Sequence, residues 1–307
     1  MRLIVTGASG FIGRNVLLRA PRDWAITAVY HHTPLEAFIT RHRLSHVRAV
    51  QCDLLDVAAV DRFAQTDGRA DAVLYLAANG DPALSATQPV LDLASNTTAL
   101  VNFLERCHAG HIVYVSSGAV YDGLHGPVSP ASSVSPRLPY AISKLASEQY
   151  LRFFCERRKT VDSFINVRFF GAYGPYEAAR KITTRWLSAV DAGQREFVIR
   201  GNGENLIDFM YVDDAVDGFL ALARAAGERR TIDFASGSPV TVNEVVRAMA
   251  RACGVEVRVR HDGHTEEFIE FRSVDSTMRE RFGFTPTISM ADGLARLRDH
   301  LKSHVNV

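Results

Sequence analysis

The chain has 307 residues, of which 47% are hydrophobic and 22% are charged, which suits one large or two smaller globular domains. Its 35 basic and 34 acidic residues give a net charge of +1, so nothing in the composition requires nucleic acid or an anionic membrane as a partner. Four widely spaced cysteines without a Cys-x-x-Cys pair argue against a zinc site or a disulfide scaffold and favour a reducing, cytoplasmic compartment. We expect no signal peptide, and no apolar run reaches the ~18 residues of a membrane-spanning helix.

The first predicted strand and helix enclose three regularly spaced glycines. An apolar run at residues 3–5 precedes Gly7, Gly10 and Gly13, and a helical pattern follows. The free N–H groups and the positive dipole end of a helix N-terminus favour an anion, and glycine lets the backbone approach it closely. The spacing differs from the commonest dinucleotide fingerprint, Gly-x-Gly-x-x-Gly, and glycine turns are common. Because this turn opens an α/β chain, we predict that it binds a phosphate group.

The second predicted strand, residues 25–30, ends where a dinucleotide fold meets the adenosine ribose. An acidic residue there binds the 2′-hydroxyl of NAD, whereas a basic one accommodates the 2′-phosphate of NADP. This strand continues into His31 and His32, with no acid before Glu36, and Arg14 lies where it could reach the same phosphate. The choice between NAD and NADP therefore stays open. We expect no metal site, since the two histidines have no third ligand nearby.

Strands and helices alternate through the next 120 residues. Further strands are predicted at 47–52, 72–78, 111–117 and 163–168, and helices at 56–64, 96–107 and 140–157. This alternation predicts an α/β fold with a Rossmann-type doubly wound parallel sheet, whose ligand crevice lies at the carboxyl ends of the strands. A loop rich in Pro, Ser and Gly, residues 123–139, is expected to cover that crevice.

The pattern changes after residue 174. Helices predicted at 181–192, 214–225, 242–253 and 290–302 mix with short strands and indicate a smaller, mixed C-terminal lobe. We therefore predict a dinucleotide-binding domain from residues 1–174 together with part of 205–235. Residues 175–307 would mainly form a substrate-binding lobe.

The predicted helix at 140–157 begins with residues that suit hydride transfer. Tyr140 and Lys144 are four apart and share one helical face. The pKa of a phenol, near ~10, is too high for a base at neutral pH, but a neighbouring ammonium and the positive charge of a nicotinamide would lower it. Ser117, at the end of the fifth predicted strand, could hydrogen-bond the same substrate oxygen. The combination predicts a carbinol held against a nicotinamide cofactor.

Taken together, these segments resemble the extended short-chain dehydrogenase/reductases, and among them the NAD-dependent epimerase/dehydratase group that acts on nucleotide sugars. The resemblance runs to about Gly293. It rests on motifs that occur in the family's order, namely Thr6–Gly13, Asp53-Leu54, Leu76-Ala77-Ala78, Ser116–Tyr121, Tyr140–Lys144 and Asp208–Asp214.

The resemblance assigns roles to individual residues. It implies that Tyr140 is the general base, that Lys144 binds the cofactor ribose, and that Ser117, with Ser116 as the fallback, contacts the substrate oxygen. It implies that Asp53 holds the adenine amino group. The full set expected to bind the cofactor is Gly7, Gly10, Phe11, Ile12, Gly13, Arg14, His31, Asp53, Leu54, Ala77, Ala78, Tyr140 and Lys144. On the substrate side the expected residues are Ser116, Gly171, Tyr173 and Arg200.

Other matched positions have less specific roles. For Asn96, a catalytic role and a role in bridging backbone groups both stay open. Asp213 and Asp214 are expected to cap a helix rather than to act in acid–base chemistry.

Several positions depart from the family's motifs. The 4,6-dehydratases carry an Asp-Glu pair after the threonine that matches Ser117, whereas this chain has Gly118 and Ala119, which disfavours a dehydratase. Gly171 replaces an asparagine that contacts the sugar or its phosphate, and Ile207 replaces an arginine that often binds the diphosphate. The candidates to replace that arginine are Arg180, Lys181, Arg185 and Arg200.

The leading hypothesis is a nucleotide-sugar 4-epimerase with tightly held NAD. The alternative is an NADPH-dependent nucleotide-sugar 4-keto reductase, favoured by Arg14 and by the absence of an acid after the second strand. A dehydrogenase of a small hydroxy compound, a 4,6-dehydratase and a non-catalytic dinucleotide sensor are less favoured. We expect a small-molecule substrate and a homodimer formed through the helices at 96–107 and 140–157.

Overall fold

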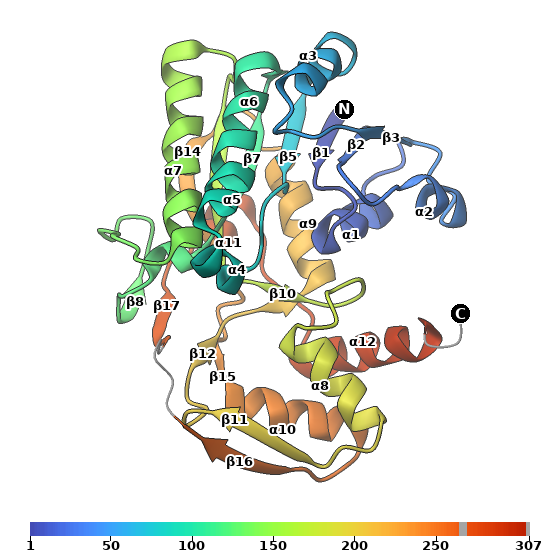
Figure 1. Ribbon diagram of the computed structural model, residues 1–307, viewed down its shortest axis with the longest axis vertical. Helices are drawn as coiled ribbons and strands as arrows, with labels where there is room; N and C mark the ends of the chain where they lie inside the picture. The colour runs from blue at the N-terminus through green and yellow to red at the C-terminus, as the bar shows by residue number, and fades with distance from the viewer. Residues whose placement is uncertain (264–268, 305–307) are drawn as a thin grey trace.

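The computed structural model describes residues 1–263 and 269–304. Within these residues, seven parallel strands form a central sheet in the order β14-β9-β7-β5-β1-β2-β3. Helices cover both of its faces, and a smaller lobe lies beyond one end (Figure 1). The predicted Rossmann-type doubly wound sheet is therefore confirmed. Its strands are β1 (Arg2–Thr6), β2 (Ala25–Tyr30), β3 (Val47–Gln51), β5 (Ala72–Tyr75), β7 (Ile112–Ser117), β9 (Phe164–Phe169) and β14 (Arg229–Phe234).

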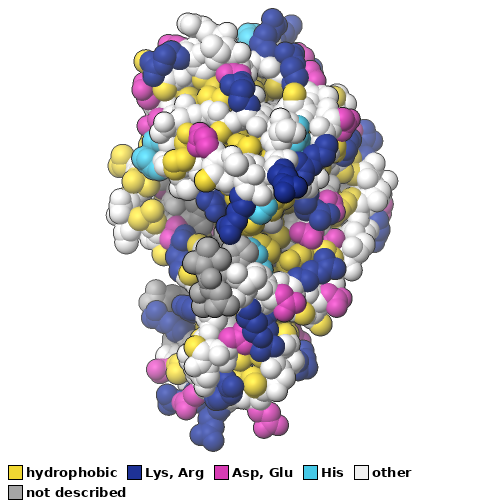
Figure 2. Space-filling view, turned by 90° about the vertical axis from the view of Figure 1, so that its right-hand side faces the viewer, with side chains coloured by type: hydrophobic (Ala, Val, Ile, Leu, Met, Phe, Trp, Pro, Cys, Tyr) yellow, Lys and Arg dark blue, Asp and Glu magenta, His cyan; other side chains and the backbone are white. Residues whose placement is uncertain are grey.

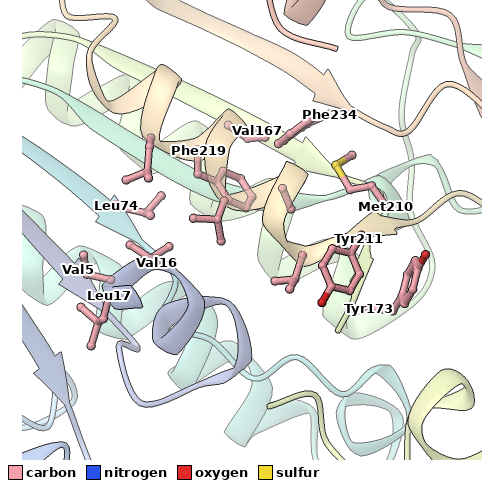
Figure 3. Packing of buried hydrophobic residues seen from close by; sticks show 14 of the residues in the cluster. Val5, Val16, Leu17, Leu74, Val167, Tyr173, Met210, Tyr211, Phe219 and Phe234 are labelled. Carbon is pink, nitrogen blue, oxygen red and sulfur yellow. The ribbon is translucent and has the colours of Figure 1, made fainter. Parts of the chain in front are cut away.

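Alternate residues of each strand enter two separate hydrophobic cores. Leu3 and Val5 pack in the core that contains α1 (Phe11–Arg19) and α9 (Val212–Ala223), whereas Ile4 packs in the other core. That second core contains α3 (Val57–Thr66), α6 (Ala99–Arg106) and α7 (Pro139–Phe153). Figure 3 shows Val16 and Leu17 of α1 beside Val5. Because both faces are covered, the strands are apolar on both sides, as parallel sheets require.

The order of the strands reverses at β1, which has β2 on one side and β5 on the other. In the register of the sheet, Thr6 pairs with Val29 on β2 and with Tyr75 on β5. The Thr6 side-chain oxygen accepts hydrogen bonds from the N–H groups of Leu76 and Ala77, both at 3.1 Å. The ends of β1 and β5 are thus joined at the reversal point, where open α/β sheets bind their ligands.

The segment between β5 and α6 differs from the prediction. Instead of one helix at 96–107, the chain forms α4 (Pro82–Thr87), α5 (Pro89–Leu93), a π-helical turn (Ala94–Thr98) and then α6. Each short helix has a proline in its first turn, where the missing N–H costs nothing. The Asp81 side chain caps α4. Helices this short do not repeat an apolar pattern, which is why the sequence did not reveal them.

The predicted loop at 123–139 contains β8 (Gly126–Val128), which pairs in parallel with β17 (Phe271–Ser273). The loop is therefore tied to a segment more than a hundred residues later. Other short elements outside the central sheet are α2 (Glu36–Arg41), β4 (Arg69–Ala70), β6 (His108–Ala109) and α11 (Thr277–Phe282). Two further turns, a 3₁₀ helix (Gly118–Tyr121) and a π-helical turn (Phe154–Arg158), follow β7 and α7.

The smaller lobe lies below the sheet in Figure 1. It contains α8 (Ile182–Asp191), α10 (Val242–Cys253), α12 (Met290–His304), the parallel pair β11 (Glu196–Arg200) and β16 (Arg258–Asp262), and the antiparallel pair β12 (Leu206–Ile207) and β15 (Val240–Thr241). The pair β10 (Ala172–Tyr173) and β13 (Met210–Tyr211) joins the lobe to the sheet, and the chain then returns to the sheet through α9 and β14.

The expected helix cap at Asp213 and Asp214 is wrong, because the N-cap of α9 is Tyr211 and both acids lie in its first turn. Asp214 is buried and accepts hydrogen bonds from the N–H groups of Thr287 and Ile288, at 3.0 and 2.8 Å. It therefore attaches α9 to the segment before α12.

In the part of the chain that the structure describes, none of the helices is both long and apolar enough to span a membrane. Basic and acidic side chains are interspersed on the face shown in Figure 2.

Candidate active site

The glycine turn after β1 has a shape that side chains would destroy. Gly7 has a φ of +64°, and a Cβ atom there would lie 2.9 Å from the backbone nitrogen of Ala77. A Cβ atom at Gly13 would lie 2.6 Å from the Cα atom and the carbonyl oxygen of Ala8. The turn therefore packs directly against the end of β5.

The first turn of α1 is open to an anion. Gly10 is the N-cap and supplies no side-chain hydrogen bond, and the turn carries no acidic residue. The N–H groups of Phe11, Ile12 and Gly13 belong to the part of a helix that lacks intrahelical acceptors. This arrangement fits the pyrophosphate of a dinucleotide.

The ends of β2 and β3 bring two predicted cofactor residues together. His31 Nε2 lies 3.4 Å from Asp53 Oδ2, and the rings of His31 and His32 stack with their centroids 3.5 Å apart. Leu54, which follows Asp53, is buried. Glu36, the first acid after β2, accepts a hydrogen bond of 3.0 Å from the hydroxyl of Tyr30.

Arg14 lies between two aromatic rings. Its guanidinium carbon is 5.5 Å from the centroid of Phe38 on α2 and 5.6 Å from that of Tyr176, which follows β10. Stacking of this kind stabilises a guanidinium through its faces and leaves its edge for hydrogen bonds. The side-chain amide of Asn15, the next residue, donates to the carbonyl of Pro175 at 2.9 Å. These contacts attach α1 to the chain that enters the smaller lobe.

The three predicted catalytic side chains converge where β7 meets α7. Ser117 is the last residue of β7, and its side chain acts on that of Tyr140, the second residue of α7. Lys144 is buried, donates to the carbonyl of Val115 on β7 at 2.9 Å, and has its Nζ 5.9 Å from the Tyr140 ring centroid. The N–H of Tyr140 donates to the Ser85 hydroxyl at 3.1 Å. A strand, a helix and an α4 residue thus hold the phenol in place.

Burial is the largest influence on the pKa values of Lys144 and Tyr140. It lowers the pKa of Lys144 to about 8, against the opposing charges of Asp92 and Glu148. It also raises the pKa of Tyr140, an effect that the Ser117 side chain opposes and the charge of Asp92 reinforces. The expected lowering of the Tyr140 pKa by its neighbours is therefore not found in the protein alone. It stays a prediction for the complex, where a nicotinamide adds positive charge.

A buried polar cluster that sequence reasoning missed supports the start of α7. Asp92 on α5 is 1% exposed, and it accepts hydrogen bonds from the side-chain amides of Asn79 and Asn96 and from the Ser143 hydroxyl, at 2.8, 2.9 and 2.7 Å. Asn96 is fully buried, and its side-chain oxygen accepts from the N–H of Asn79 at 2.7 Å. Asn96 thus acts here as a bridge. The four-residue spacing of Asp92 and Asn96 was the one sequence signal for the cluster.

Ser116, the predicted fallback for Ser117, is directed elsewhere. It is buried and donates to Glu148 Oε1 at 2.5 Å, and Glu148 forms a buried ion pair with Arg168. Ser117 is the serine whose side chain acts on Tyr140, whereas the Ser116 hydroxyl is bound to Glu148, further along the same helix. The structure therefore does not support the expectation for Ser116.

Tyr173, predicted to contact the substrate, is a core residue. It is 1% exposed, its hydroxyl donates to the carbonyl of Met290 at 3.4 Å, and its ring packs on those of Phe209 and Tyr211. Figure 3 shows Tyr173 beside Tyr211. The Tyr-Gly-Pro motif identified the position but not its burial, so this expectation is also corrected.

The remaining predicted residues lie apart. Gly171 has a φ of +146°, which favours glycine, and its carbonyl accepts from the N–H of Met210 at 3.2 Å. Arg200 is exposed at the end of β11 in the smaller lobe. Arg180, a candidate for the missing diphosphate arginine, pairs with Asp81 at 3.2 Å. Among the described residues, no three His, Cys, Asp or Glu side chains gather in a way that could hold a metal ion.

Comparison with known proteins identifies the family of this chain. The model of the NAD dependent epimerase/dehydratase family matches residues 3–234. The chain belongs to this family. Proteins with different activities are similar to it. The UDP-glucose 4-epimerase of Mycolicibacterium smegmatis is 26% identical over 96% of this chain and 97% of that protein. The dTDP-glucose 4,6-dehydratase of Streptomyces griseus is 29% identical over 95% of this chain and 92% of that protein.

Solved structures agree over the full length. MoeE5 in complex with UDP-glucose and NAD has a TM-score of 0.86 and 26% identity, with 99% of this chain and 100% of that chain covered. The chain therefore shares its fold with a protein solved in complex with UDP-glucose and NAD.

Proposed function

We propose that the protein is a nucleotide-sugar 4-epimerase that works with tightly held NAD. The observation that carries this proposal is the convergence of Ser117, Tyr140 and Lys144 at the carboxyl end of β7, in a sheet whose β1 ends in a glycine turn that fits a pyrophosphate. The UDP-glucose 4-epimerase among the relatives supports the same activity.

In this proposal, three side chains manage the proton of the sugar C4 hydroxyl. Tyr140, as the phenolate, takes that proton, and Ser117 donates a hydrogen bond to the same oxygen. The Lys144 ammonium stabilises the phenolate and binds the cofactor ribose. The nicotinamide supplies reversible hydride transfer. Tyr140 returns the proton after the keto sugar has presented its other face, so that C4 is inverted without net oxidation.

The cofactor itself would be held by the residues of the glycine turn and the neighbouring strand ends. Phe11, Ile12 and Gly13 offer N–H groups to the pyrophosphate, and Asp53 contacts the adenine. Ala77 and Ala78, after β5, are small enough to let the cofactor lie close. We propose NAD because the structurally similar MoeE5 binds NAD with UDP-glucose.

The sequence after Ser117 argues against a dehydratase. Loss of water from a keto sugar needs an acid and a base, and Gly118 and Ala119 supply neither. A Cβ atom at Gly118 would lie 3.2 Å from the ring of Phe170, so a longer side chain there would have to displace that ring.

A specific observation favours the alternative, an NADPH-dependent 4-keto reductase. The end of β2 carries no acid for a ribose 2′-hydroxyl, and Arg14 is stacked between Phe38 and Tyr176 near the start of α1. The cofactor released from denatured protein separates the two activities. Bound NAD supports the epimerase, whereas an empty protein that prefers NADPH supports the reductase.

The substrate class is tested by thermal shift with a panel of UDP-, GDP-, CDP- and dTDP-sugars. We expect one nucleotide series to stabilise the protein by mass action. If none of them stabilises the protein, the proposal of a nucleotide-sugar substrate is wrong. The replacement of the diphosphate-binding arginine by Ile207 would then explain the lack of binding.

We further propose a homodimer formed through α7, as expected, and through α5 in place of α6, which covers most of the other expected range, 96–107. Large apolar side chains are exposed on both helices, which contact each other, and these side chains are Val90, Leu91, Leu93, Ile142, Tyr150 and Phe153. An apolar patch of this kind marks an interface, and a second copy would bury it in an isologous contact. We also propose a cytoplasmic location, which the four free cysteines support.

A further inference from the structure

We propose that Asp92 is a positioning residue for this reaction: its buried carboxylate anchors the first turn of α7, and its negative charge holds the Lys144 side chain in the ammonium form. The inference rests on the proposed roles of Tyr140 and Lys144.

The anchoring follows from the contacts of Ser143, which lies between the two catalytic residues on α7. Its hydroxyl donates to Asp92 Oδ2 at 2.7 Å, lies 2.9 Å from the Tyr140 carbonyl oxygen and receives the Asn96 amide at 3.0 Å. Asp92 therefore connects α5 and the π-helical turn to the helical turn that carries Tyr140 and Lys144. A displacement of α5 would move both side chains.

Hydrogen bonding alone does not explain why this residue is an acid. Its three donors, Asn79, Asn96 and Ser143, are all neutral. An asparagine at position 92 could accept from both amides through its oxygen and donate to the Ser143 oxygen through its nitrogen. A buried carboxylate is costly unless a cation compensates it, and the buried side chain of Lys144 directly follows Ser143, which donates to Asp92.

The charged and titratable groups around Lys144 can be named element by element. On β7 it faces the ring of Tyr114 at 5.2 Å, on its own helix it faces Tyr140 and Glu148, and from α5 it is influenced by Asp92. The charge of Asp92 raises the pKa of both Lys144 and Tyr140. Loss of that charge must therefore shift both titrations to lower pH. Burial already lowers the pKa of Lys144 to about 8, so a further decrease would enlarge the neutral fraction of this side chain near neutral pH.

The Asp92→Asn variant tests the charge, because it preserves the shape and the hydrogen-bonding pattern. The chain has lysines at positions 144, 159, 181 and 302, of which the last three are exposed. Labelling with [¹³Cε]lysine therefore gives few signals, and Lys144→Arg assigns the buried one. Labelling with [¹³Cζ]tyrosine and the Tyr140→Phe variant reports Tyr140. The matched control is Glu105→Gln, which removes an exposed carboxylate from α6.

We expect Asp92→Asn to move the titration midpoints of Lys144 and Tyr140 to lower pH, and Glu105→Gln to move neither. Unchanged midpoints, or a rise in either one, would overturn the inference. Ser143→Ala provides a second test, because it breaks the anchor but keeps the charge. It should reduce turnover without moving the Lys144 midpoint, and an equal shift in both variants would mean that the role of Asp92 is structural only.

These titrations need no substrate. They therefore stand even if no nucleotide sugar is converted, which is the result that would count against the proposed function.

Discussion

Individual buried carboxylates in this protein have distinct environments. Asp92 and Asp233 both accept hydrogen bonds from neutral donors, which for Asp233 on β14 are the hydroxyls of Tyr121 and Ser273 at 2.7 Å, but Asp233 also experiences the charge of a second carboxylate, Asp275. Arg168 donates to the same Tyr121 hydroxyl at 3.1 Å. Burial raises the pKa of Asp233 to about 7. This residue therefore titrates in the neutral range and should make the stability of the fold depend on pH.

The sign of that dependence follows from linkage. An unfolded aspartate has a pKa near ~3.9, so between that pH and about 7 the folded protein binds more protons than the unfolded chain. Stability is fully present at low pH and falls as the pH rises, by roughly 2–4 kcal/mol from this group. We predict that Asp233→Asn raises the melting temperature at pH 8 and flattens the profile between pH 4 and 7. Calorimetry across this range checks it, and a variant less stable than wild type at pH 8 would be inconsistent with the raised pKa.

At the scale of elements, the glycine turn and α1 depend on a close backbone contact. We predict that Gly13→Ala destabilises the protein by about 1–3 kcal/mol and weakens NAD binding, because its Cβ atom would lie 2.6 Å from Ala8. Gly80→Ala is the matched control, since a Cβ atom there has nothing within 4 Å. Chemical denaturation and NAD titration measure both effects. Equal behaviour of the two variants would show that the turn tolerates a side chain.

Sequence patterns predicted elements and motifs well where the signal is local. Tyr140 and Lys144 are one helical turn apart, and Ser117 ends a strand, so these positions could be selected from the sequence, and the fold brings their side chains together. Asp92 could not be predicted, because its partners Asn79 and Ser143 come from segments that meet only in three dimensions. The prediction that Tyr173 contacts the substrate failed for a related reason, because a sequence motif does not reveal which residues bury a side chain.

On the scale of the whole molecule, the exposed apolar side chains of α5 and α7 should lie between two copies of the chain. We predict that the double variant Tyr150→Glu/Phe153→Glu is monomeric, because two buried charges would face each other across a symmetric contact. Val198→Glu, a replacement of an exposed apolar residue on β11 in the other lobe, should leave the dimer intact. Light scattering at several protein concentrations measures both. A wild-type protein that is monomeric throughout would refute the interface.

The measurement that tests the proposed activity most directly uses purified protein without added cofactor. The protein is incubated with the nucleotide sugar that stabilises it best, and the C4 configuration of the product is followed by proton NMR. We predict that the C4 epimer accumulates to equilibrium without net formation of NADH. Tyr140→Phe should lower the rate by about 10²–10⁴-fold while it still binds NAD. Full activity of Tyr140→Phe, or conversion that requires stoichiometric NADPH, would contradict an epimerase that uses this tyrosine.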